Sequence, residues 1–154
     1  MSDMDEIAAQ LLPMGEHTLL LPNGVVAEIL RQVPLQSLER AGPAWILGTF
    51  PWQGQTVPLV SFNRLIHPLA NVPEGRKCVI VKTLDTDALL PCYALHIESF
   101  PQFVGLQRHG MLLDATTDQQ PHGIRTAVLV GGKTALVPDL DYIEELLGQW
   151  MTQG

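Results

Sequence analysis

Short apolar runs, separated by turn residues, fill this chain between residues 15 and 137. The turns draw on 12 prolines and 13 glycines, which end a strand or reverse the chain more readily than other residues do. Runs of this length are too short for typical helices and are characteristic of β-strands. The punctuation therefore predicts a mainly β protein with about eight short strands, folded as a small closed barrel or a pair of barrels.

Three turn signals divide the expected strands into hairpins. Asn23-Gly24 lies between two apolar runs, where this dipeptide is a strong hairpin signal. Segment 51–54 and Gly131-Gly132 predict two more hairpins, and residues 114–123 are predicted to form a polar loop. The strands are expected at 17–21, 25–31, 45–50, 55–61, 77–84, 90–97, 103–107, 126–130 and 134–137.

The N-terminal segment, residues 1–14, is predicted to form a short amphipathic helix outside the main domain. Ile7, Leu11 and Met14 lie at helical spacing. Pro13 and Gly15 would end this helix.

A second helix is predicted at the C-terminal end, over residues 139–151. Asp139 is its expected N-cap, because the carboxylate can accept the unpaired amide hydrogens of the first turn. Its apolar face is formed by Leu140, Ile143, Leu147 and Trp150. Residues 61–66 are expected to form one shorter helical turn.

The charge balance is acidic, with 9 Lys and Arg residues against 16 Asp and Glu, a formal net charge of −7. A nucleic-acid binder needs a basic surface to displace counterions from phosphates, and anionic lipids attract basic segments as well. We therefore expect no nucleic-acid partner and no electrostatic membrane anchor.

Charged residues make up only 16% of the chain, against about 25% in an average globular protein. Hydrophobic residues make up 46%, so a domain this small has more apolar surface than it can bury alone. No apolar run reaches the roughly 18 residues that span a bilayer, and the acidic N-terminus does not resemble a signal peptide. We expect a cytoplasmic protein without direct membrane insertion.

The sequence carries no complete catalytic motif. Gly132-Lys133-Thr134 resembles the end of a phosphate-binding loop, but Ala127 stands where that loop requires glycine. No nucleophile elbow occurs either. We therefore predict that the protein is not an enzyme and has no catalytic residues.

The histidines and cysteines are not spaced as metal ligands. His96-Ile97-Glu98 resembles a zinc-deaminase motif, yet Cys92 lies before it, and that motif requires its cysteines after it. Cys78 and Cys92 lie inside apolar runs and are expected to be buried free thiols, although their number also allows one disulfide. We predict no metal site and no cofactor.

The strand 25–31 carries a first candidate binding surface. Strict alternation places Val26, Glu28 and Leu30 on one face of this strand. That face is either an outward surface with a central carboxylate or the rim of a barrel, where the acid pairs with a nearby Arg.

The hairpin at 51–54 carries a second candidate surface. Trp52 either folds back over the end of a barrel or forms part of an exposed partner surface. Pro58 has no amide hydrogen, so its strand is expected at a sheet edge or a bulge. We expect the surplus apolar surface around residues 26–30 and Trp52.

Three stretches, in order, resemble a known family. They are Val25-Val26-Ala27-Glu28-Ile29-Leu30, then Trp45-Ile46-Leu47-Gly48-Thr49-Phe50, then Gly54-Gln55-Thr56-Val57-Pro58-Leu59-Val60 followed by Leu65-Ile66. Their order and spacing look like the CheW-like domain of bacterial chemosensory systems. The resemblance is close over about residues 18–66, continues loosely through 77–97 and returns at 137–141.

The resemblance implies two small SH3-like β-barrels that share a core, as two intertwined subdomains of one domain spanning residues 15–154. It also implies a non-catalytic adaptor that couples methyl-accepting chemoreceptors to the regulatory domain of a CheA-type histidine kinase. In such adaptors the receptor tip docks near the groove between the barrels. Val26 and Glu28 match the family's binding strand, and Gly48 and Gly54 match its turn glycines. The expected partner-binding residues are Val26, Glu28, Leu30, Gly48, Trp52, Gln53, Gly54 and Pro58.

The chain departs from the family at the hairpin, which usually reads Asn-Leu-Arg-Gly and here reads Pro51-Trp52-Gln53-Gly54. Gln53 carries neither the charge nor the two-pronged hydrogen bonding of Arg, which supports receptor coupling in the family. This predicts a divergent or accessory adaptor, such as those of type IV pilus (twitching) chemosensory clusters. The alternative is a small-molecule-binding or catalytic β-barrel, suggested by the surplus of apolar residues and the five histidines.

Overall fold

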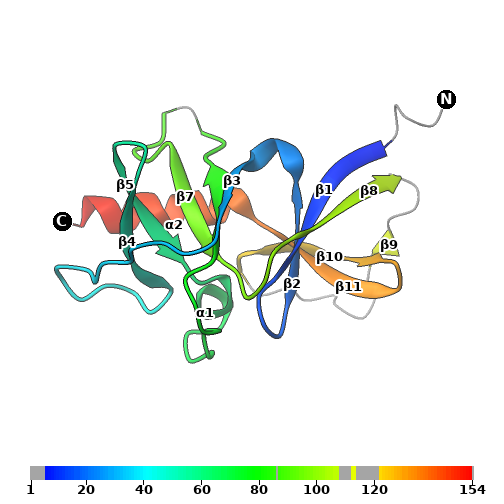
Figure 1. Ribbon diagram of the computed structural model, residues 1–154, viewed down its shortest axis with the longest axis horizontal. Helices are drawn as coiled ribbons and strands as arrows, with labels where there is room; N and C mark the ends of the chain where they lie inside the picture. The colour runs from blue at the N-terminus through cyan, green and yellow to red at the C-terminus, as the bar shows by residue number, and fades with distance from the viewer. Residues whose placement is uncertain (1–5, 86, 108–111, 114–121, 154) are drawn as a thin grey trace.

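The part of the chain that the structure describes forms two β-sheets and two α-helices. We analysed a computed structural model, which describes residues 6–85, 87–107, 112–113 and 122–153. The six-stranded sheet has the order β8-β1-β2-β11-β10-β9 (Figure 1). Its strands are β1 (Glu6–Pro13), β2 (Thr18–Pro22), β8 (Gln102–Gln107), β9 (Leu112–Leu113), β10 (Ile124–Val130) and β11 (Lys133–Pro138).

The five-stranded sheet has the order β3-β6-β7-β5-β4. Its strands are β3 (Val26–Leu30), β4 (Ile46–Trp52), β5 (Gln55–Val60), β6 (Cys78–Lys82) and β7 (Cys92–His96). The two sheets lie at opposite ends of the molecule in Figure 1, and the helix α2 (Leu140–Thr152) runs along the five-stranded sheet. The short helix α1 (Phe62–Ile66) follows β5.

The largest hydrophobic core joins the two sheets. It contains Leu12 and Leu19 from the six-stranded sheet, Val79 and Leu95 from the five-stranded sheet, and Ile143 from α2. Each sheet also encloses a smaller core of its own. The predicted mainly β fold, with two small barrels sharing a core and a helix at the C-terminal end, is therefore confirmed.

The closing helix begins where the sequence predicts. The Asp139 carboxylate accepts a hydrogen bond from the Tyr142 backbone N–H over 3.2 Å, as an N-cap does. Leu140, Ile143 and Leu147 are buried against the shared core. The hairpins β4–β5 and β10–β11 and the short helix α1 are likewise confirmed. Of the predicted polar loop, residues 114–121 lie outside the described residues.

The predicted N-terminal helix is wrong, because residues 6–13 form the strand β1. This strand pairs with β2 on one side and with β8 on the other. Pairing on both sides satisfies the backbone N–H and C=O groups, which outweighs the helical spacing of a few apolar side chains.

The predicted hairpin at Asn23-Gly24 is also wrong. Residues Asn23–Val25 form a single 3₁₀ turn, and the chain passes there from the six-stranded sheet to the five-stranded sheet. The flanking strands β2 and β3 therefore belong to different sheets. A turn signal fixes a local change of direction and leaves the partner of each strand open.

Pro58 was expected at a sheet edge or at a bulge, and the edge is wrong, because β5 lies between β4 and β7. A bulge does occur next to it, where the β4–β5 register shifts between Ile46 and Gly48, opposite Leu59 and Val60. Pro58 pairs with Thr49 of β4, while pairing with β7 is confined to Leu59 and Val60. The proline thus precedes the part of β5 that needs amide hydrogens on its second side.

Candidate functional site

The two stretches singled out in the sequence, the strand β3 and the β4–β5 hairpin, meet in space. β3 and β4 are the outermost strands of the five-stranded sheet, yet Trp52 Nε1 donates a hydrogen bond to Glu28 Oε1 over 3.1 Å. Leu30 and Trp52 both pack against the core enclosed by this sheet. The sheet therefore curls into a barrel, and the Glu28–Trp52 pair lies where its first and last strands approach each other.

A β-bulge changes which residues of β3 share a face. The register with β6 shifts between Val26, which pairs with Val81, and Glu28, which pairs with Ile80. Val26 packs against the shared core, whereas Leu30 packs against the core of the five-stranded barrel. The expectation that Val26, Glu28 and Leu30 share one face is therefore wrong, because the extra residue of the bulge interrupts the alternation.

The tip of the hairpin is a tight two-residue turn. Gln53 has φ of 48° and Gly54 has φ of 76°, and both are exposed. The flanking residues Trp52 and Gln55 pair across the hairpin. Left-handed values at both central positions are typical of the turns that match the twist of the flanking strands. Gln53 therefore extends from a tight turn beside Trp52.

Gly48 is buried and permits a close approach between backbones. A Cβ atom at this position would lie 2.4 Å from the carbonyl oxygen of Gln36. The neighbouring Thr49 and Gln36 exchange two backbone hydrogen bonds, of 2.7 and 2.9 Å. The absence of a side chain at Gly48 thus allows the 35–36 segment to pack against β4. The role of this glycine is therefore in the fold.

Pro58 lies on another side of the hairpin from Trp52. It is buried and lines an open hollow of 520 Å³ together with Leu38, Trp150 and Met151. The structure therefore brings together Glu28, Leu30 and Trp52, with Gln53 and Gly54 at the adjoining turn. Val26, Gly48 and Pro58 are placed elsewhere.

The exposed apolar side chains are not where the sequence predicts them. In the described residues the large exposed ones are Leu69, Leu84, Leu89, Phe100, Phe103 and Met151. None of these lies in Val26–Leu30 or at Trp52. The expectation that the surplus apolar surface lies around these residues is therefore wrong. Two cationic side chains lie over the Phe100 ring. The guanidinium carbon of Arg31 is 5.6 Å and the Nζ atom of Lys77 is 4.9 Å from the ring centroid.

The thiols and His96 lie inside the five-stranded barrel. Both cysteines are buried and free. Burial, with a smaller contribution from Glu28, raises the pKa of the Cys78 thiol to about 12. Burial also lowers the pKa of His96, although its ring Nε2 lies 3.0 Å from the Gly75 carbonyl oxygen. These groups are therefore neutral near pH 7.

The histidines do not converge on a catalytic or metal arrangement in the part of the chain that the structure describes. His17 and His67 line an open hollow of 590 Å³ with Glu16 and Glu98. No three His, Cys, Asp or Glu side chains among the described residues are placed to hold a metal ion. No helix in the same residues is both long enough and apolar enough to cross a bilayer.

Two sheets with a shared core and a single long helix define a class of small double-barrel β proteins. The family model of the CheW-like domain matches residues 9–146, and the chain belongs to that family. Its fold is similar to that of the scaffolding protein TtCheW from Thermoanaerobacter tengcongensis. That crystal structure superposes with a TM-score of 0.69 at 12% identity, over 87% of this chain and 89% of the other. No curated protein sequence matches this chain. Family membership supports a role as a scaffold or adaptor in chemosensory signalling.

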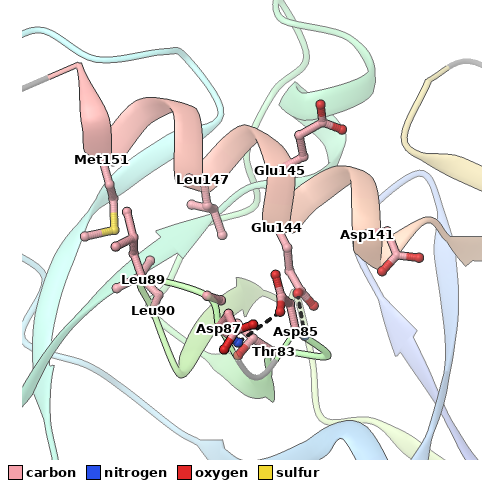
Figure 2. A pocket seen from close by; sticks show the side chains of 12 residues that line it. Thr83, Asp85, Asp87, Leu89, Leu90, Asp141, Glu144, Glu145, Leu147 and Met151 are labelled. Atoms are coloured by element: carbon pink, nitrogen blue, oxygen red, sulfur yellow. Dashed lines mark hydrogen bonds between the residues drawn. The ribbon is translucent and has the colours of Figure 1, made fainter.

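Sequence reasoning missed one arrangement of charged residues. Asp85 with Asp87, and Glu144 with Glu145, form two separate pairs of acids in the sequence, the first between two expected strands and the second in the closing helix. The structure places them around one hollow between the β6–β7 loop and α2 (Figure 2). Only the pairing of two acids in each segment is visible in the sequence, and no spacing rule joins segments about 60 residues apart.

Proposed function

We propose that this protein is a non-catalytic adaptor that binds the CheW-like regulatory domain of a CheA-type histidine kinase and links it to chemoreceptors. The match of the CheW-like domain family to residues 9–146 carries this proposal. The similarity to a solved scaffolding protein agrees with it at the level of the fold. Binding of barrel to barrel suits a protein whose surface is sparsely charged and whose two barrels share one core.

The proposed kinase-binding surface is the barrel end around the Glu28–Trp52 pair. Leu30 and Trp52 supply apolar area there, and Glu28 supplies a carboxylate that is exposed and already oriented by the indole. The two-residue turn presents Gln53 and Gly54 beside them. In this proposal Val26, Gly48 and Pro58 act indirectly, by holding β3 and the hairpin in place.

The proposed contact with chemoreceptors lacks a cation at the hairpin. Gln53 is exposed at the turn and is uncharged, where the family hairpin usually carries Arg. An amide cannot form the two-pronged ion pair of a guanidinium. We therefore propose that this adaptor is a divergent member with weakened receptor coupling, as in pilus-associated systems, and that it works in the cytoplasm.

Titration calorimetry tests the kinase contact directly. The full chain is titrated into the isolated regulatory domain of a CheA-type kinase from the same genome, at tens of micromolar, the range of transient complexes. Saturable heat, with co-elution on a sizing column, is the expected result. Absence of both heat and co-elution at these concentrations would contradict the proposal. A matched titration with Gln53→Arg tests the receptor part, because this variant should strengthen binding to a receptor tip and leave kinase binding unchanged.

A further inference from the structure

A hollow of 470 Å³ lies between α2 and the loop that joins β6 to β7. Its volume falls within the range of sites that hold small ligands or a few protein side chains. Glu144 of α2 links the helix to the loop. Its carboxylate accepts hydrogen bonds from the backbone N–H groups of Leu84, over 2.7 Å, and Asp85, over 3.2 Å. The hollow is therefore a property of the folded domain, with walls held by specific bonds.

One end of the hollow is apolar. The side chains of Leu89, Leu90 and Met151 lie together at this end in Figure 2. Leu89 is 62% exposed and Met151 is 39% exposed, although Leu147 beneath them is buried. Large apolar side chains that line a concave surface and remain exposed to water are typical of protein-binding sites.

The other end of the hollow is acidic. Asp85, Asp87 and Glu144 lie there, with Asp141 beyond them (Figure 2). Glu145 also lines the hollow, but its side chain points away from this cluster. None of the lining residues is Lys or Arg. The negative potential extends into the protein, because Glu144 and Asp141 add to burial in raising the pKa of Tyr93. Arg125 lies 3.3 Å from Asp141 and is a cationic partner of that carboxylate.

We propose that this hollow docks a peptide segment of a partner protein in which an apolar side chain lies next to Lys or Arg. The apolar side chain would pack between Leu89 and Met151, and the cation would lie against Asp85 and Asp87. Charge complementarity selects this occupant, because a second copy of this chain carries a net charge of −7 and would be repelled. The lining of this hollow includes neither Glu28 nor Trp52, so the proposal does not depend on the proposed kinase contact.

Amide chemical-shift mapping on the ¹⁵N-labelled full chain tests this surface. The probe is a short synthetic peptide of leucine, lysine and serine. Two control peptides replace either the lysines by glutamate or the leucines by serine. The probe should shift the amides of 87–90 and 147–151 with a dissociation constant on the order of 100 μM, and both control peptides should bind at least about tenfold more weakly.

Two matched pairs of variants locate the site. Leu89→Ser should weaken binding of the probe about tenfold, while Leu69→Ser, at a leucine that is 89% exposed elsewhere, should leave it unchanged. Asp87→Asn should weaken it about threefold, while Glu74→Asn, at an exposed acid outside the hollow, should not.

Four results of the titrations with peptides would overturn the proposal. They are the absence of shifts at millimolar peptide, shifts spread over acids across the surface, equal binding of the peptide without leucine, and equal effects of Leu89→Ser and Leu69→Ser. Broadening of the same amides with protein concentration alone would show that a second copy covers the hollow, and would also overturn it. These outcomes do not depend on the titration with the kinase domain. They still test the hollow if that titration fails.

Discussion

The indole N–H of Trp52 donates a hydrogen bond of 3.1 Å to the carboxylate of Glu28, and this bond joins the two outermost strands of the five-stranded sheet. The two residues lie 24 positions apart in the chain. Trp52 also packs against the core inside that barrel, so the same side chain closes the barrel and borders its surface. Its contribution to folding and its contribution to binding must therefore be separated by experiment.

A double-mutant cycle measures the Glu28–Trp52 bond itself. Glu28→Ala and Trp52→Phe should each destabilise the protein, with a coupling energy of about 1 kcal/mol, because a charge-assisted bond near solvent is worth less than a buried one. Urea denaturation of the four proteins supplies the free energies of unfolding. Glu16→Ala, in the other half of the molecule, is the control and should be additive with Trp52→Phe. A coupling energy of zero for Glu28 would mean that the bond adds nothing to stability.

Trp52→Ala should weaken binding to the kinase regulatory domain more than it weakens folding. The loss of this half-buried ring should cost about 2 kcal/mol of stability, since complete burial of Trp is worth more. Binding should fall by at least about tenfold at a temperature where the variant stays folded, because aromatic residues dominate protein interfaces. Calorimetry on the variant and on Trp52→Phe checks this. Unchanged binding by a folded Trp52→Ala protein would limit Trp52 to a role in the core.

Gly48→Ala should destabilise the protein much more than Gly54→Ala. Both glycines have positive φ, at 156° and 76°, but only a Cβ at Gly48 would meet another backbone, at 2.4 Å from the Gln36 oxygen. We expect a loss of about 3 kcal/mol at Gly48 and about 1 kcal/mol at Gly54, where no atom lies within 4 Å. Urea midpoints of the two variants test this, and equal losses would show that the 35–36 segment yields to the new methyl group.

Glu144→Ala should release the β6–β7 loop from α2. The amides of Leu84 and Asp85 lose their acceptor in this variant, so their hydrogen exchange should accelerate about tenfold while the strands remain protected. Exchange measured by mass spectrometry on peptides that cover 83–91 checks the effect. Glu145→Ala, one residue further along the helix, is the control and should leave the loop unchanged. Equal exchange in both variants would contradict the tether.

Stability should decrease in mild acid because of His96. Burial lowers the pKa of His96 below 6.5 in the folded protein, while the unfolded chain takes up a proton near that value. Below pH 6.5 the unfolded state therefore binds more protons, and the free energy of unfolding falls by up to about 1.4 kcal/mol per pH unit. His96→Gln should flatten this dependence in urea titrations between pH 7 and pH 5. An equally steep dependence in the variant would assign the effect to other groups.

Local signals predicted the elements whose partners are close in the chain. The hairpin β4–β5 follows from two apolar runs on either side of Gln53-Gly54, and the start of α2 follows from Asp139. In each case the interacting residues lie only a few positions apart. A short stretch of the sequence therefore contains both partners of the interaction. In the same way, the apolar residues next to Cys78 and Cys92 in the sequence predict that both are buried free thiols, as the structure shows.

The remaining features depend on partners that are far away along the chain. The spacing in 1–14 indicates a helix, but β1 pairs with β8, about a hundred residues away. The alternation in β3 is interrupted by a bulge that only its pairing with β6 creates. Likewise Glu28 and Trp52 were each singled out, yet nothing in their own segments shows that they touch.

The sequence by itself determined the mainly β class, the closing helix and the acidic charge balance, because these depend on composition and short-range order. Its resemblance to the CheW-like domain, carried by the order and spacing of three stretches, indicated the family. The tertiary structure decided which strands share a sheet, where the apolar surplus lies and which side chains form each surface. Leu89, Met151 and the acids of 85–87 and 144–145 become one hollow only when α2 packs over the β6–β7 loop. The physical reason is that pairing and packing between distant segments outweigh local preferences of a few tenths of a kcal/mol per residue.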